Sequence, residues 1–207
     1  WWVVTFTNGF EYIITFLVSE TGVVFHDKVK TGYTKRAEGT IGQIVFSPNG
    51  QHLALYTGNK LNSVTGGGFC LWEFDRCSGT ISNLRTVVGE QQFIENGIAF
   101  SQDGKKMYVS NGTHIKQYDP FSPKFKLYEK VVAIIDSFYY EPEPNPNNIK
   151  IPVDFDNLKL GPDGKIYVFP SSGTQIYLSY IDYPDETDDQ VGVRQHAIYM
   201  PRLFTRT

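Results

Sequence analysis

A short turn motif that recurs three times constrains the fold of this chain more than any other feature. Each copy has an apolar residue, three residues that favour a turn and a closing glycine, and an apolar run follows. The copies are Phe46-Ser47-Pro48-Asn49-Gly50, Phe100-Ser101-Gln102-Asp103-Gly104 and Leu160-Gly161-Pro162-Asp163-Gly164. Their closing glycines lie 54 and then 60 residues apart. A unit of strands and turns that repeats every ~40 to 50 residues, or slightly more, is typical of β-propeller blades.

The chemistry of the motif predicts a strand, a tight turn and a second strand. Pro48 presets φ at the second position of a type I turn, Asn49 bonds to the neighbouring backbone, and Gly50 relaxes the exit. The run after each turn is apolar at nearly every position, as in Leu53-Ala54-Leu55-Tyr56. Such a run suits a strand covered on both faces, and stacked blades provide that cover because each sheet lies between two neighbours.

The repeat therefore predicts an all-β fold, a β-propeller with about four four-stranded blades from a larger ring of six to eight. The expected blades cover residues 1–31, 40–90, 92–136 and 153–200, and a proline-rich surface loop covers residues 138–151. The first blade lacks its innermost strand, which would lie before Trp1 or come from the strand that closes the ring. Because the chain begins inside a strand, with neither an initiator Met nor a signal peptide, we expect a fragment or a processed product. A closed ring of four blades is the alternative.

Composition narrows the class of protein further. Aromatic residues make up 15% of the chain, and with 19 glycines they favour all-β over helical architecture. The formal net charge of −3 argues against nucleic-acid binding. No apolar run approaches the ~20 residues that a membrane span needs. Cys70 and Cys77 are expected to be separate, partly buried thiols, because mostly extended backbone between them holds their sulfurs apart.

The residue types that carry most enzyme chemistry do not cluster in the sequence. His26, His52, His114 and His196 are scattered, without His-x-His, His-Glu-x-x-His or Cys-x-x-Cys spacing. We expect surface or turn histidines, with a zinc site assembled from distant blades as the alternative. The serines lack a Gly-x-Ser-x-Gly elbow, and Gly66-Gly67-Gly68 precedes a strand rather than a helix. The sequence thus predicts no catalytic residue, no metal and no cofactor.

Two groups of carboxylates are weaker candidates for a functional site. Asp154 and Asp156 share one face if their segment is extended, and such a pair could serve acid–base or sugar chemistry. A solvated loop or turn is the preferred interpretation. The acidic segment 182–189 could chelate calcium, but it lacks the alternation with glycine found in loop-type sites. We expect an exposed acidic turn there.

Phe138-Tyr139-Tyr140, just before the proline-rich loop, is the candidate binding surface. Aromatic side chains on a projecting loop can stack on sugars or anchor a protein partner. The alternative is that these rings hold the loop against the blade beneath it.

Several segments together resemble one family of propellers. The turn motif is shared by TolB-like and WD40-like propellers. A more specific likeness lies in Trp1-Trp2-Val3-Val4 and in the run Trp-Glu-Phe-Asp-Arg-Cys-Ser-Gly-Thr-Ile-Ser-Asn at residues 72–83, supported by residues 45–50, 97–104 and 160–168. These segments resemble the later blades of the propeller region of large surface proteins of gliding bacteria, which carry PKD-type repeats and a type IX secretion signal. The resemblance implies export to the cell surface or the medium, and it transfers no catalytic residue.

Three hypotheses for function follow. The first is a non-catalytic, secreted or cell-surface propeller that binds a protein or glycan in an adhesion, gliding-motility or type IX secretion assembly. The second is a periplasmic TolB-like scaffold subunit of an envelope machine. The third is a propeller enzyme, a lyase or hydrolase, with a site on the central channel.

Overall fold

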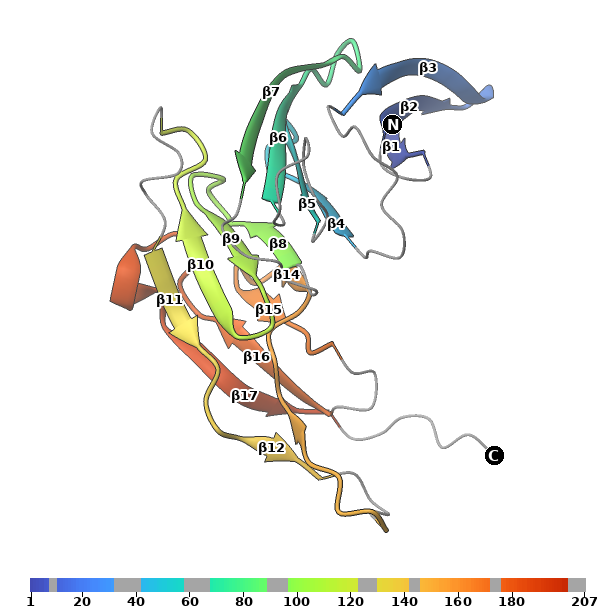
Figure 1. The fold of residues 1–207 in the computed structure, drawn as a ribbon. Coiled ribbons are helices and arrows are strands. Elements are labelled where there is room, and N and C mark those ends of the chain that lie inside the picture. The colour runs from blue at the N-terminus through green and yellow to red at the C-terminus, as the bar shows by residue number, and fades with distance from the viewer. Residues whose placement is uncertain are drawn as a thin grey trace. The chain divides into compact units, whose positions relative to one another are not determined.

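The computed structural model of the chain describes residues 1–7, 11–31, 42–57, 68–88, 97–122, 130–141, 146–171 and 176–200 (Figure 1). Antiparallel sheets make up almost all of the regular structure in these segments. The chain folds as two compact units, Trp1–Ile94 and Glu95–Thr207. No helix in the described segments has the length and apolar character that a membrane crossing requires.

Three of the sheets have four strands each, and the strands lie side by side in chain order (Figure 1). The sheet of the first unit consists of β4 (Gly42–Phe46), β5 (His52–Thr57), β6 (Gly68–Phe74) and β7 (Ile81–Val88). The second unit has β8 (Gly97–Phe100), β9 (Met107–Ser110), β10 (His114–Tyr118) and β11 (Lys130–Ile134), and then β14 (Leu158–Leu160), β15 (Ile166–Val168), β16 (Tyr177–Ile181) and β17 (Val193–Tyr199). Every neighbouring pair is antiparallel, which is the strand order of a propeller blade.

The first unit also contains a sheet of three strands, β1 (Trp2–Phe6), β2 (Tyr12–Ser19) and β3 (Gly22–Lys30). Ile13 of β2 packs with the buried side chains of the four-stranded sheet, among them Leu53, Cys70 and Trp72. The half-buried Trp2 adds its ring to this core, and its indole Nε1 donates to the carbonyl of Arg76 at 2.8 Å. Apolar burial between the two sheets therefore holds the first unit together.

The two four-stranded sheets of the second unit also share one core, which includes Tyr108, Ile115, Phe155 and Ile166. Gly97 is required at their contact, because a Cβ there would lie 2.0 Å from the backbone oxygen of Asp156. The side chains of this core come from the strands on both sides of the turn motif, from β10 and β16, and from Phe155 and Val191.

The three copies of the motif adopt the same turn, as predicted. The N–H of the closing glycine donates to the carbonyl oxygen of the residue three positions earlier. The distances are 2.8 Å for Gly50, 3.0 Å for Gly104 and 3.2 Å for Gly164. Each of these glycines has a positive φ, between 69° and 82°. That backbone region is open to glycine at little cost, so the motif ends in glycine for a steric reason.

The proline-rich segment differs from the expected loop at both of its ends. β12 (Tyr139–Tyr140) pairs with β13 (Ile151–Pro152) to form a two-stranded ladder outside the larger sheets. The expectation of a loop over residues 138–151 was therefore wrong for its ends. Three prolines, at positions 142, 144 and 146, fall between these strands in the sequence, whereas Pro152 lies in β13.

Both cysteines are free, as expected. Cys70 is buried in the core, whereas Cys77 is exposed rather than partly buried. Gly66 and Gly67 lie outside the described residues.

Candidate functional site

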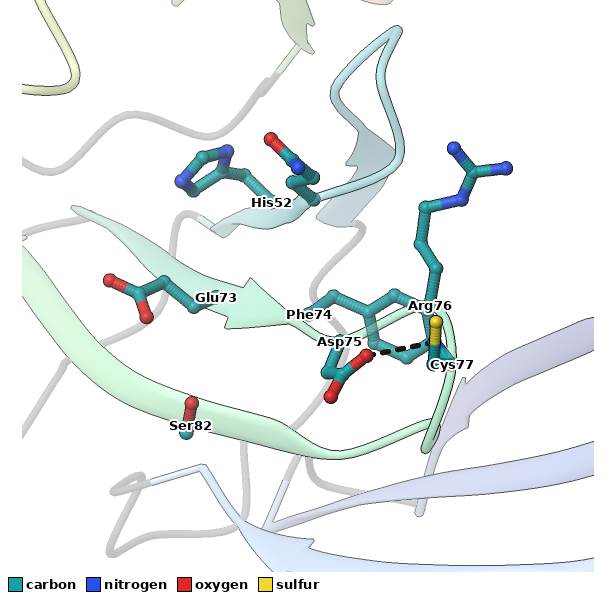
Figure 2. Close-up of a pocket in the computed structure, with 8 residues that line it drawn as sticks. His52, Glu73, Phe74, Asp75, Arg76, Cys77 and Ser82 are labelled. Atoms are coloured by element: carbon teal, nitrogen blue, oxygen red, sulfur yellow. Dashed lines mark hydrogen bonds between the residues drawn. The ribbon is translucent and has the colours of Figure 1, made fainter.

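A pocket of about 700 Å³ lies at one end of the β4–β7 sheet (Figure 2). It is lined by Gln51, His52, Glu73, Phe74, Asp75, Arg76, Cys77 and Ser82. Gln51, which follows the turn motif, and His52 of β5 form one side, and the connection between β6 and β7 contributes the opposite rim. The polar and charged groups of the lining come from segments about 20 residues apart, which only strand pairing brings together.

Three of the lining residues form a row across the sheet. His52 of β5 pairs with Glu73 of β6, and Glu73 pairs with Ser82 of β7. Directly paired residues project their side chains from the same face of a sheet. Glu73 accepts a hydrogen bond of 2.6 Å from Nδ2 of Asn83, which has a positive φ of 52°. The pocket therefore places a positioned carboxylate beside an imidazole.

The electrostatic environment keeps His52 neutral. Burial lowers its pKa from the ordinary value, and although the charge of Glu73 acts in the opposite direction, the net shift is downward. A neutral imidazole can accept a proton or a hydrogen bond at neutral pH. The Glu73 and His52 pair is thus able to bind a polar ligand or to act in proton transfer.

The opposite rim is built by a tight turn. Oδ1 of Asp75 accepts a hydrogen bond from the backbone N–H of Cys77 at 2.8 Å (Figure 2). It also accepts one from the backbone N–H of Ser78 at 3.3 Å. These bonds hold the pKa of Asp75 below its usual value. Nη1 of Arg76 donates to the carbonyl of Asn49 at 3.1 Å, which ties this turn to the turn motif. Asp75 and Arg76 therefore support the shape of the rim.

Sequence reasoning missed Glu73, Asp75 and Arg76 as members of a site. In the sequence they belong only to the run at residues 72–83 that carries the family resemblance. The sole local signal was His52 directly after the turn motif. Which residue of β6 faces His52 depends on strand register, and the register is set by long-range pairing.

The predicted aromatic surface is divided between two environments. Phe138 stacks on His196 with ring centroids 4.1 Å apart, and it meets Tyr177 edge-on at 5.2 Å. Tyr140 is buried and lies 6.3 Å from the same Tyr177 ring. Tyr139 is 51% exposed, and as the intervening strand residue it projects to the opposite side. Phe138 and Tyr140 thus hold the ladder against β16 and β17, while Tyr139 remains available at the surface.

The other predicted candidates bond to protein neighbours. Asp154 accepts hydrogen bonds from the backbone and the hydroxyl of Ser171, and Asp156 accepts one of 2.6 Å from Asn157. The segment between residues 153 and 157 forms an isolated bridge through Phe155 rather than a strand. Nδ1 of His114 lies 2.7 Å from the hydroxyl of Thr113. Within the described segments, no three His, Cys, Asp or Glu side chains meet in a way that could hold a metal ion.

The acidic segment has a structural role that was not expected. Its carboxylates are largely exposed, but its backbone packs on the neighbouring sheet. The buried hydroxyl of Tyr108 donates to the carbonyl of Pro184 at 2.8 Å, and Nε2 of Gln117 donates to the carbonyl of Glu186 at 2.7 Å. Oδ1 of Asp185 accepts the backbone N–H of Asp103 at 2.9 Å. The segment is thus a clasp between the two sheets of the second unit, not only a solvated turn.

Neither a family model nor a curated protein matches this chain. Solved structures do. A candidate 6-phosphogluconolactonase from Bacteroides uniformis matches with a TM-score of 0.55 at 15% identity, over 95% of this chain and 54% of that chain. A protein from Lactobacillus plantarum matches with a TM-score of 0.54 at 16% identity, over 96% of this chain and 55% of that chain.

This chain has a β-propeller fold. It spans about half the length of the solved propellers it matches. At such low identity the likeness concerns the fold alone, because one propeller architecture hosts many unrelated functions.

Proposed function

We propose that this propeller module binds a protein or glycan partner and does not catalyse a reaction on it. The observation that carries the proposal is Tyr139, an exposed aromatic ring on a ladder whose neighbouring rings are packed. A tyrosine side chain has only two rotatable side-chain bonds, so it loses little conformational entropy for the large area that it contributes on binding. Its flat ring suits the apolar face of a sugar or an apolar side chain of a partner, and its hydroxyl offers a hydrogen bond.

The surroundings of Tyr139 extend this surface. Tyr139 pairs with Pro152 on the opposite strand, so two rings share one face of the ladder. Lys150 forms an exposed ion pair with Glu141 at 3.1 Å. An apolar centre with charged groups at its rim is the arrangement of many recognition surfaces.

We also propose that the protein acts at the cell surface. The resemblance of the chain to surface propellers of gliding bacteria supports this location. Fractionation of the source cells, with detection by an antibody against the chain, tests it. Recovery from the surface or medium is expected, and recovery from the periplasm alone would favour the TolB-like scaffold instead.

Binding is tested with the purified chain on a glycan array and against labelled outer-surface proteins. Tyr139→Ala is expected to weaken the strongest interaction by at least about tenfold, the loss typical of an aromatic anchor. Tyr183→Ala is the matched control, because Tyr183 is 59% exposed and lies on the acidic segment. Equal affinity of both variants and the parent, or no binding on either platform, would overturn the proposal.

Hydrolysis at the pocket is the second candidate, favoured by the pairing of His52 with Glu73. The solved structure from Bacteroides uniformis suggests 6-phosphogluconolactone as one substrate to assay. Turnover that is abolished by both His52→Ala and Glu73→Gln would replace the non-catalytic proposal. Loss of turnover in only one variant would not establish catalysis. His52 lies beside the turn motif, so its substitution could also act by disturbing that turn.

A further inference from the structure

The second unit holds its own acidic clasp, residues 182–189, with a row of side chains on the β8–β11 sheet. Strand pairing aligns the four members of this covered row, which are Ala99, Tyr108, Gln117 and Lys130. Two of them donate to backbone carbonyls of the clasp, as described above. Lys130 adds an ion pair of 3.9 Å with Asp188. The covered row is therefore a binding surface for an acidic segment.

The turn motif places an equivalent row on the β14–β17 sheet. Ala99 and Lys159 each precede a copy of the motif directly, so they occupy equivalent positions. Pairing from Lys159 across the sheet gives the open row, which consists of Lys159, Tyr167, Tyr180 and Arg194. Paired residues project from the same face of a sheet. The open row thus repeats the tyrosine and the terminal cation of the covered row.

The open row is less covered than its counterpart. Tyr108 and Gln117 are 0% and 5% exposed, whereas Tyr167 and Tyr180 are only half-buried. Lys159 and Arg194 are exposed, and neither forms an ion pair with another residue that the structure describes. The core of the second unit takes its side chains from the opposite face of this sheet. The fold therefore leaves the open row available to a ligand.

The turn beside each row supplies a further donor. At the covered row, the backbone N–H of Asp103 donates to Oδ1 of Asp185 at 2.9 Å. The third turn has the same backbone bond to its closing glycine, so it places the N–H of Asp163 at the equivalent point. The Tyr167 hydroxyl donates to Asp163 at 2.9 Å in an exposed position, where exchange of this partner costs little. Both donors are thus accessible to an incoming acidic segment.

The acidic composition belongs to the clasp and not to the connections of these sheets in general. Each connection joins the third and fourth strands of its sheet. Five of the eight residues at 182–189 are acidic, against one of six at residues 75–80 and two of eleven at residues 119–129. A further sheet of this kind would therefore not by itself bring an acidic segment to the open row.

We propose that the open row binds an acidic, proline-containing peptide segment of a separate partner protein. Carboxylates of this segment pair with Lys159 and Arg194, which face it from the two ends of the row. Its backbone carbonyls accept hydrogen bonds from the hydroxyls of Tyr167 and Tyr180. The surface is distinct from Tyr139, so its test is independent of the proposed function.

The probe is a peptide with the sequence of residues 182–192, closed into a ring through its ends. In the clasp, the backbone N–H of Asp182 donates to the carbonyl of Gly192 at 3.2 Å, so ring closure preorganises the native shape. The peptide is titrated into the full chain, and NMR signals are followed residue by residue. Shifts are expected at Tyr167, Tyr180 and Arg194. Added salt is expected to weaken binding, because it screens exposed charges.

Two charge reversals give a matched pair. Arg194→Glu is expected to weaken binding of the peptide at least about tenfold, because it sets like charges against each other. Lys130→Glu changes the equivalent position of the covered row, which the clasp already occupies, so the affinity should stay within about twofold. If Arg194→Glu fails to fold, Lys159→Glu replaces it.

Two further changes separate the roles of carboxylates and hydroxyls. Tyr167→Phe is expected to weaken binding about three- to tenfold through loss of one donor. A ring peptide with amides in place of the carboxylates at positions 185, 186, 188 and 189 should bind at least about tenfold more weakly than the acidic peptide.

Three outcomes would overturn the proposal. The first is equal affinity for the acidic and the amide peptide, or no binding of either. The second is a set of shifts at Tyr108 and Gln117 in place of Tyr167 and Tyr180, which would mean that the peptide only displaces the clasp. The third is binding by residues 1–207 but not by the protein isolated from its source cells free of other proteins. That result would assign the open row to a segment of the same polypeptide.

Discussion

Glycines with similar backbone angles in this protein have different surroundings. Gly79 has a φ of 74°, and a Cβ at this position would lie 2.4 to 2.7 Å from three atoms of the Trp2 ring. Gly164 has a φ of 82°, but nothing lies within 4 Å of the corresponding Cβ. The backbone cost of a side chain is therefore similar at both positions, whereas the steric cost arises only at Gly79.

Gly79→Ala is expected to destabilise the first unit more than Gly164→Ala destabilises the second. The strained backbone alone costs about 1 kcal/mol, and displacement of Trp2 from the core should add about 1 to 2 kcal/mol. Urea unfolding followed by tryptophan fluorescence and by circular dichroism measures both effects. Equal losses in the two variants would show that Trp2 moves aside freely.

The acidic clasp shows how an element outside the sheets stabilises them. The Tyr108 hydroxyl donates to the carbonyl of Pro184 and accepts from Nε2 of Gln117 at 2.6 Å. Burial raises the pKa of Tyr108 well above its usual value, so the phenol remains a donor at any physiological pH. Removal of this hydroxyl would leave a buried carbonyl without its donor.

Tyr108→Phe is therefore expected to cost about 1 to 3 kcal/mol of unfolding free energy. Tyr167→Phe is the control, because its hydroxyl bonds to Asp163 at 2.9 Å at an exposed position and its loss should cost less than about 1 kcal/mol. Thermal and urea unfolding compare the two variants. A Tyr108→Phe protein as stable as the parent would mean that the clasp contributes little.

The unfolding free energy of the whole molecule should depend on pH, because aspartates in the turns that join its strands have lowered pKa values. Burial alone would raise the pKa of Asp103, but hydrogen bonds from Lys105 and Ser101 outweigh it and lower that pKa to about 2. The pKa values of Asp75 and Asp163 are lowered as well. A carboxylate with a lowered folded-state pKa stabilises the fold above its unfolded pKa of about 3.9, and this contribution is lost as the pH falls.

The carboxylates are thus expected to make the unfolding free energy decline between about pH 4 and pH 2, in addition to a decline that begins near pH 6.5 from His52, whose folded-state pKa is lowered. Asp103→Asn should make the carboxylate decline shallower without removing it, because Asp75 and Asp163 still titrate. The substitution should be tolerated, since Asn49 accepts equivalent bonds from Ser47 at 2.7 Å and Gln51 at 3.0 Å. The test is to measure the urea midpoints of the parent and of Asp103→Asn across this pH range. The same slope of stability against pH in both proteins would contradict the prediction.

The sequence by itself determined the local turns and the order of the strands. Pro48, Asn49 and Gly50 act through their own backbone preferences, and the apolar run after them requires cover on both faces. Because these effects are local, the turn motif predicted both the equivalent turns and the all-β propeller fold.

Only the tertiary structure decided which side chains meet. The pairing of His52 with Glu73, the division of Phe138 and Tyr140 from Tyr139, and the clasp on Tyr108 depend on strand register and on contacts between segments far apart in the chain. A shift of one residue in register would turn each of these side chains to the other face, and no local propensity specifies that choice.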